Sequence, residues 1–276
     1  MGFIIKRNVE KFTTFPKFIT HCKKQEICIN VTVLFEKNNK VFNFGKSNHT
    51  MLTEVKTTLY SLDDYLRLVE IVEDKPFFEY SEGIIYWRYD QKEVPEEILD
   101  FLFSPDYDWY KFMQLALQYH LEMKSKNHSL INSNIFLEIG KQLNQEKYNL
   151  YTEDPNIKIP NKEKSRMPDL CATSAIDEKR DEKGLVENPI VNIEILLPST
   201  QKIDKTEKLE EYRSIPSLQE YIMIEQDKIG IEQHIRKGKS KWEVNLLDEK
   251  DKSLQIKAIE VDIAIAKIYN KVALKK

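Results

Sequence analysis

The stretch from Asn188 to Thr200 constrains the fold of this chain more than any other. It reads Asn-Pro-Ile-Val-Asn-Ile-Glu-Ile-Leu-Leu-Pro-Ser-Thr, a nearly continuous apolar run with a proline near each end. Short apolar runs of this kind are typical of a strand that is buried on both faces of a sheet. Glu194 interrupts the run, and an ionised carboxylate buried without a partner is costly. We therefore expect Glu194 to be protonated, or to meet a cationic neighbour or a metal ion.

Length and composition predict a globular protein with a sizeable core. The chain has 276 residues, of which 41% are hydrophobic, which suits one large domain or a domain with an appendage. The net charge of −3 excludes a basic field over the whole surface, so any attraction for nucleic acid must come from a local patch. Seven glycines are too few for a Gly-rich phosphate loop or a dinucleotide-binding fingerprint.

Cysteine usage and hydropathy predict the compartment. The three cysteines are an odd number at spacings that suggest no disulfide framework, and the N-terminus does not resemble a secretory signal. No apolar run approaches the roughly 20 residues that span a bilayer. We expect a soluble, cytoplasmic protein without a membrane partner.

The pattern along the chain predicts a mixed α/β fold, with helices early and a mostly β second half. Residues 1–57 read as an N-terminal extension, in which the alternating runs 26–35 and 41–44 predict a β-hairpin. Residues 58–276 form the main domain, a central mixed sheet flanked by helices. Within it, residues 87–126 read as a helical insertion.

Local signals predict several elements of the main domain. A helix is expected to begin at Ser61, with Asp64 completing a capping box. Two short strands should flank the turn at 81–83, and residues 160–166 read as a basic loop. Three strands are expected between residues 219 and 247, followed by a closing helix over 261–269.

Period-two alternation in the central strand places Asn192, Glu194 and Leu196 on one face. If Asp169 lies on the neighbouring strand, its carboxylate and that of Glu194 converge on a common position. Two carboxylates held together in a partly buried site repel each other. A hard cation with oxygen ligands, Mg²⁺ or Mn²⁺, removes that repulsion, which makes this pair a candidate metal site.

A helix directly after the central strand carries Lys205, Lys208 and Tyr212 on one face. A lysine from this helix can reach back to the carboxylates, where an ammonium helps activate water and offsets charge on a phosphate. Tyr212 is expected to pack or to orient the lysine. His128 is expected just before the first turn of another helix, where both a local hydrogen-bonding role and a catalytic role stay open.

Several of these segments together resemble the Uma-two family of bacterial endonuclease-like proteins. The similar segments are Met-Pro-Asp169-Leu, the central strand through Thr200, residues 204–213 and 215–221, Asn-His128-Ser-Leu-Ile, and Phe-Glu79-Tyr-Ser-Glu-Gly, so the resemblance covers about 58–276. It implies a restriction-endonuclease-like core of the PD-(D/E)XK superfamily and metal-dependent hydrolysis of phosphodiester bonds in DNA. It also implies that Asp169 and Glu194 are metal ligands, Lys208 a displaced active-site lysine, and Glu79 an additional acidic residue.

This chain departs from the superfamily pattern at Leu196, where a lysine is usual two residues after the second carboxylate. Activity therefore depends on Lys208 or Lys205 acting from the helix. The alternatives are a catalytically impaired module that binds DNA or protein, a purely structural salt bridge between Glu194 and Lys208, or a hydrolase of another phosphate ester. The segment 87–126 is a candidate site cover, partner-binding element or homodimer contact.

Overall fold

The computed structural model describes residues 58–73, 77–152 and 155–275. The chain divides into two units, one up to Thr57 and one from Thr58 onward. The hairpin predicted within 1–57 lies outside the described residues. All elements below belong to the second unit.

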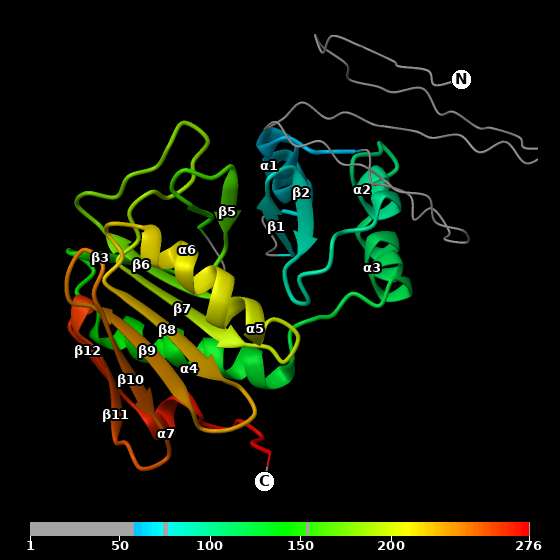
Figure 1. Ribbon diagram of the computed structural model, residues 1–276. Coiled ribbons are helices and arrows are strands. Elements are labelled where there is room, and N and C mark those ends of the chain that lie inside the picture. Colours follow the sequence, from blue (N-terminus) through cyan, green and yellow to red (C-terminus); the bar gives the residue numbers. More distant parts are fainter. Residues whose placement is uncertain (1–57, 74–76, 153–154, 276) are drawn as a thin grey trace, which may run out of the picture. The chain divides into compact units, whose positions relative to one another are not determined.

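A six-stranded mixed sheet forms the core of this unit (Figure 1), with strand order β10-β9-β8-β7-β6-β3. The strands are β3 (Tyr148–Thr152), β6 (Leu170–Ser174), β7 (Val191–Leu196), β8 (Glu220–Glu225), β9 (Ile231–Arg236) and β10 (Trp242–Leu247). β7 and β8 run parallel, and the other neighbours run antiparallel. Parallel neighbours need a crossover, which is made here by α5 (Gln201–Ile203), η1 (Asp204–Lys208) and α6 (Leu209–Ser214). The predicted mixed α/β fold, with a central mixed sheet and flanking helices, is confirmed.

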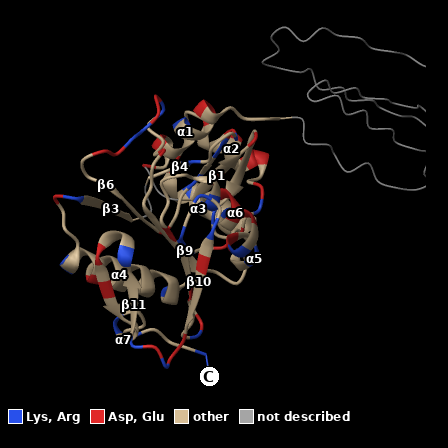
Figure 2. Ribbon diagram, turned by 60° about the vertical axis from the view of Figure 1, so that its left-hand side comes forward, with Lys and Arg blue, Asp and Glu red and all other residues tan. Residues whose placement is uncertain are grey.

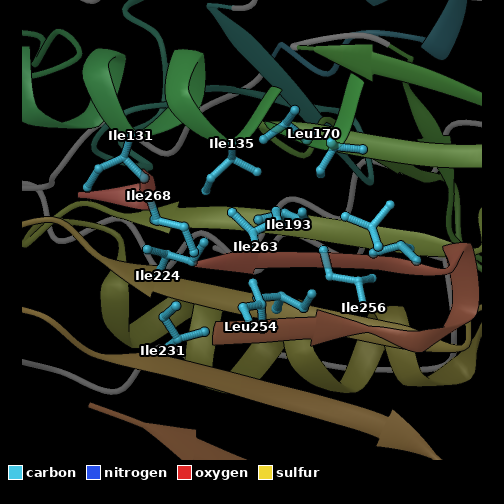
Figure 3. Packing of buried hydrophobic residues seen from close by; sticks show 14 of the residues in the cluster. Ile131, Ile135, Leu170, Ile193, Ile224, Ile231, Leu254, Ile256, Ile263 and Ile268 are labelled. Atoms are coloured by element: carbon cyan, nitrogen blue, oxygen red, sulfur yellow. The ribbon is translucent and has the colours of Figure 1, made fainter. Parts of the chain in front are cut away.

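β7 is the strand predicted from the apolar run, and all six of its residues are buried. Ile193 and Ile195 point into the larger hydrophobic core, together with Ile131 and Ile135 of α4 (Lys126–Gln142). The same core is closed by β11 (Ser253–Ile256), η2 (Lys257–Ile259), β12 (Val261–Ala264) and α7 (Ile265–Ile268). Figure 3 shows how closely these aliphatic side chains interlock, so this face of β7 is devoted to packing.

The opposite face of β7 lies against the crossover helices. Leu196 belongs to a second hydrophobic cluster with Leu209 and Tyr212 of α6 and with Tyr221 and Met223 of β8. Asn192 and Glu194 share this face by the alternation of the strand. The crossover therefore covers the polar positions of β7.

A second, four-stranded antiparallel sheet has the order β2-β1-β5-β4. Its strands are β1 (Phe78–Ser81), β2 (Ile84–Trp87), β4 (Ile157–Lys158) and β5 (Lys164–Arg166). Glu82 and Gly83 both have positive φ, 50° and 89°, as a tight hairpin turn between β1 and β2 requires. The predicted strands around this turn are confirmed.

Three helices precede α4: α1 (Leu62–Ile71), α2 (Glu96–Leu102) and α3 (Trp109–Gln118). Ser61 caps α1, and Asp64 completes the predicted capping box. α2 and α3 lie within the helical segment predicted over 87–126. Among the described residues, no helix is both long enough and apolar enough to cross a bilayer.

Two local predictions were wrong. Residues 164–166 of the predicted basic loop form β5, which pairs with β1 through Tyr80 and Ser165. The predicted closing helix over 261–269 is helical only from Ile265 to Ile268, and Val261 to Ala264 form β12. Burial alternates along β12, with Val261 and Ile263 inside, and this period-two pattern indicates a strand.

Candidate active site

Asp169 lies on the short segment that connects the smaller sheet to the larger one. It follows β5 of the smaller sheet by three residues and directly precedes β6 of the larger sheet. The antiparallel register pairs Leu170 with Ile193, which brings Asp169 level with Glu194 on β7. The backbone N–H of Ile195 donates to Asp169 Oδ2 at 2.7 Å. The structure thus brings the predicted carboxylate pair level with each other, Asp169 at the residue before β6 and Glu194 within β7, and both residues are at most 4% exposed.

Lys208 reaches the same place from the crossover. It ends the π-helical turn η1, a rare geometry that occurs frequently at functional sites. Its ammonium lies 3.4 Å from Glu194 Oε1 and 3.1 Å from both Asp204 Oδ1 and Glu79 Oε1. Since Lys208 is 2% exposed, three acidic side chains surround a cation that water barely reaches.

Glu79 comes from β1 and is 1% exposed. Besides Lys208, it binds Arg166 Nη1 at 2.6 Å and accepts a hydrogen bond from Gln91. Burial alone would raise the pKa of Glu79, but the cations of Lys208 and Arg166 outweigh it and hold the pKa at about 2. Glu79 is therefore an ionised counter-ion at neutral pH.

Glu194 behaves in the opposite way. Burial raises the pKa of Glu194 to about 8, with added repulsion from Asp169 and Asp204, although Lys208 acts to lower it. The hydroxyl of Tyr212 donates to Glu194 Oε1 at 3.1 Å, so Tyr212 orients the carboxylate instead of the lysine. Burial thus favours the protonated form of Glu194, whereas the Lys208 ammonium favours the ionised form.

The pKa of Asp169 is lowered despite burial, because His128 and Arg88 contact the carboxylate. Arg88 Nη2 lies 2.8 Å from Oδ1, and His128 Nε2 lies 3.1 Å from Oδ2. An ionised carboxylate can only accept, so Nε2 of His128 carries the proton. Two adjacent carboxyl groups with pKa values pushed in opposite directions are a pattern of acid–base sites.

The structure places His128 within the first turn of α4, whose N-cap is Ser125, and not before it as predicted. Lys205 lies outside the group, because its ammonium contacts Glu225 at 3.1 Å and Glu232 at 3.7 Å. Leu196 is 2% exposed on the face of Glu194 and offers no donor. Of the two candidate lysines, the structure brings only Lys208 to the carboxylates.

Two cations of the site were missed by sequence reasoning. Arg88 follows β2 directly, and Arg166 ends β5, the segment that was predicted to be a loop. Arg166 also binds Glu211 at 2.8 Å, while Lys164 Nζ lies 2.7 Å from another oxygen of Glu211. The only sequence signal for Arg88 is its position at the end of an apolar strand, which is a weak one.

The donor chemistry of the pair fits a hard divalent cation. Asp169 and Glu194 supply carboxylate oxygens from adjacent strands, and Mg²⁺ commonly takes one or two carboxylates and fills its shell with water and phosphate. Across residues 58–73, 77–152 and 155–275, no group of three or more His, Cys, Asp and Glu side chains has an arrangement able to hold a metal. The pair would therefore supply only part of the coordination shell.

Comparison with known proteins shows the family of this chain. The model of the family described as "Uma2: Putative restriction endonuclease" matches residues 119–266, which is more than half of the chain. Asp169, Glu194, Lys208 and His128 lie inside the matched region, whereas Glu79 lies before it.

Two curated proteins of Synechocystis sp. (strain ATCC 27184 / PCC 6803 / Kazusa) are similar to this chain. "Uncharacterized protein sll1609" is 28% identical over 119 residues, which are 43% of this chain and 67% of the relative. "Uncharacterized protein slr1290" is 26% identical over 151 residues, 54% of this chain and 77% of the relative. Neither name states an activity.

Proposed function

Because this chain belongs to the Uma2 family, a class of the PD-(D/E)XK superfamily, we propose that it is a metal-dependent endonuclease that hydrolyses phosphodiester bonds of DNA. The observation that carries the proposal is the pair formed by Asp169, just before β6, and Glu194, on the adjacent strand β7, with the Lys208 ammonium 3.4 Å from Glu194. A carboxylate pair with a positioned ammonium is the side-chain set that metal-assisted phosphoryl chemistry needs.

Each residue has a role that follows from its contacts. Asp169 and Glu194 would hold Mg²⁺ or Mn²⁺, which would act as a Lewis acid on the phosphate and lower the pKa of water. Lys208 offsets the negative charge that develops on the phosphate, and Glu79 holds the lysine in place through their ion pair. Tyr212 fixes the orientation of Glu194 through its hydroxyl.

DNA would be drawn in by a local set of cations. Lys and Arg are intermixed with Asp and Glu along the described elements (Figure 2), in line with the net charge of −3. Binding to phosphates that relies on few cations is weak at high salt. Because the salt dependence grows with the number of phosphates that are contacted, we expect affinity for DNA to fall with a shallow slope as the salt concentration rises.

The test is cleavage of supercoiled plasmid by the full-length chain in the presence of Mg²⁺ or Mn²⁺. Wild type is expected to nick or linearise the plasmid, and chelation should stop the reaction. Asp169→Asn should lower the rate by about 100-fold or more, because one metal ligand is lost. The matched control is Asp177→Asn, since the Asp177 side chain is 72% exposed and its ion-pair partner is Lys179, which is not part of the site.

Undiminished, metal-dependent cleavage by Asp169→Asn would overturn the assignment of the site. The products also report on assembly, because cutting both strands at one position takes two such centres. A homodimer would give linear plasmid early in the reaction, and a monomer would accumulate nicked circles first.

The competing function is a nuclease-fold module that binds DNA or protein without cutting. Leu196 favours it, because this buried side chain replaces the usual lysine, and so does the full set of ion pairs around Asp169. A wild-type protein that shifts a DNA duplex in a mobility assay, but never cleaves it with Mg²⁺ or Mn²⁺, would support the module.

A further inference from the structure

The guanidinium of Arg88 forms an ion pair with Asp169. Its backbone N–H donates to the carbonyl of Phe77 at 2.8 Å, which fixes the chain just after β2. The residue is 4% exposed, and its guanidinium lies 5.7 Å from the ring centre of Tyr89. Arg88 is therefore a buried and well-supported cation next to the candidate metal ligands.

Arg88 and a metal ion compete for the same carboxylate. Asp169 Oδ2 already accepts hydrogen bonds from the N–H of Ile195 and from His128. Asp169 Oδ1 is the remaining oxygen, and Arg88 Nη2 occupies it at 2.8 Å. A divalent cation beside this guanidinium would meet a like charge at close range in a poorly screened site.

The second terminal nitrogen of the guanidinium, Nη1, makes no such contact with Asp169. Within the described part of the chain, Arg88 Nη1 is buried and has no hydrogen-bond partner. A buried donor without a partner is unfavourable, and the planar fork of arginine matches two oxygens of a phosphate. The orphaned Nη1 therefore points to an anionic ligand.

Lys124 is a second cation that contacts the Tyr89 ring. Its ammonium lies 5.6 Å from the Tyr89 ring that Arg88 also faces. Burial lowers the pKa of Lys124 to about 8, and repulsion by Arg88 contributes, whereas Asp169 acts to raise it. Two cations that repel each other are both relieved when a phosphate binds between them.

We propose that Arg88 is an internal counter-ion that blocks Asp169 from divalent cations until a phosphodiester binds to its guanidinium and releases Asp169 Oδ1. The inference rests on the proposed function, since it concerns the same carboxylate pair. It makes metal binding and DNA binding reciprocal, so that each strengthens the other by the same factor. In this role Arg88 contacts the phosphodiester directly and controls the access of a metal ion to Asp169.

Calorimetric titration with Mn²⁺ tests the coupling in the full-length chain, alone and with a short phosphorothioate DNA duplex. Wild type should bind Mn²⁺ about tenfold more tightly when the duplex is present. Arg88→Gln without duplex should bind Mn²⁺ about tenfold more tightly than wild type, and the duplex should change its affinity less than twofold. The matched control is Arg67→Gln, which removes the same charge from the exposed face of α1 and should titrate like wild type.

Equal Mn²⁺ affinity of wild type and Arg88→Gln in the absence of duplex would overturn the role of Arg88 and leave the proposed function standing. No Mn²⁺ binding by either protein, even with duplex, would remove the metal site and with it both proposals. If Arg88→Gln does not fold, Arg88→Lys is titrated instead, because it keeps the charge but loses the fork. Its coupling between Mn²⁺ and duplex should fall at least threefold, and unchanged coupling would overturn the inference.

Discussion

The two faces of β7 alternate residue by residue and yet have opposite physical character. Val191, Ile193 and Ile195 pack into the larger core, and every one is at most 3% exposed. On the other face, Asn192 has neither side-chain N nor O paired among the described residues, and Glu194 meets Lys208 and Tyr212. One face stabilises the fold by burial, whereas the other buries polar groups at a cost in stability.

The comparison teaches that burial alone does not reveal the role of a residue. Both faces are equally inaccessible to water, so the distinction lies in what each side chain contacts. Changes on the apolar face should alter stability without altering chemistry, and changes on the polar face should alter both.

The largest expected effect comes from removing the central cation of the polar face. Lys208→Met leaves Glu79 and Asp204 buried without their ammonium, which should lower the free energy of unfolding by about 3–5 kcal/mol. Urea unfolding at pH 7 measures it. Lys208→Arg keeps the charge and should recover most of the loss. A Lys208→Met protein as stable as wild type would mean that the lysine is not the counter-ion of this cluster.

The second effect is a pH dependence of stability that comes from Glu194 on the polar face. Burial raises the pKa of Glu194 to about 8 from an ordinary value of 4.5, so the folded state holds a proton that the unfolded chain loses earlier. The stability contributed by Glu194 is therefore fully present below pH 4.5 and is lost as the pH rises through about 8.

Glu194→Gln removes this titration. From pH 5 to pH 8, the free energy of unfolding of wild type should fall by at least about 1 kcal/mol more than that of Glu194→Gln. Denaturant unfolding at several pH values measures the two slopes. Parallel curves for the two proteins would show that Glu194 is ionised in the folded state.

The smallest effect is expected on the apolar face. Ile193→Val removes one methylene from the core and should lower the free energy of unfolding by about 0.5–1.5 kcal/mol. Plasmid cleavage per folded molecule should stay unchanged, because Ile193 points away from Glu194. Loss of cleavage in a stably folded Ile193→Val protein would contradict the claim that the apolar face affects only stability.

Sequence patterns predicted the parts of the site that lie within single elements. Alternation along the central strand placed Glu194 and Leu196 on one face, and helical spacing placed Lys208 within reach of it. The position of Asp169 beside this strand was a condition of the predicted site, and the register of Leu170 with Ile193 fulfils it. For Glu194, Leu196 and Lys208 the relevant signal is local.

The missed parts depend on contacts between distant segments. Arg88 meets Asp169 across 81 residues, and Arg166 meets Glu79 across 87 residues. Nothing in the local periodicity around Arg88 or Arg166 specifies a partner so far along the chain. Lys205 and Lys208 share a helical face in the sequence pattern. In the structure both lie in a π-helical turn, and Lys205 binds Glu225 instead of the carboxylate pair.

The central claim is that the polar face of β7 supplies half of a divalent-cation site. Anomalous scattering from crystals grown with Mn²⁺ and a short DNA duplex tests it most directly. The account predicts a peak within about 2.0–2.6 Å of carboxylate oxygens of both Asp169 and Glu194, the usual range for hard cations, with Arg88 moved off Asp169. A site without a peak, with Arg88 still bound to Asp169 and the duplex in place, would contradict it.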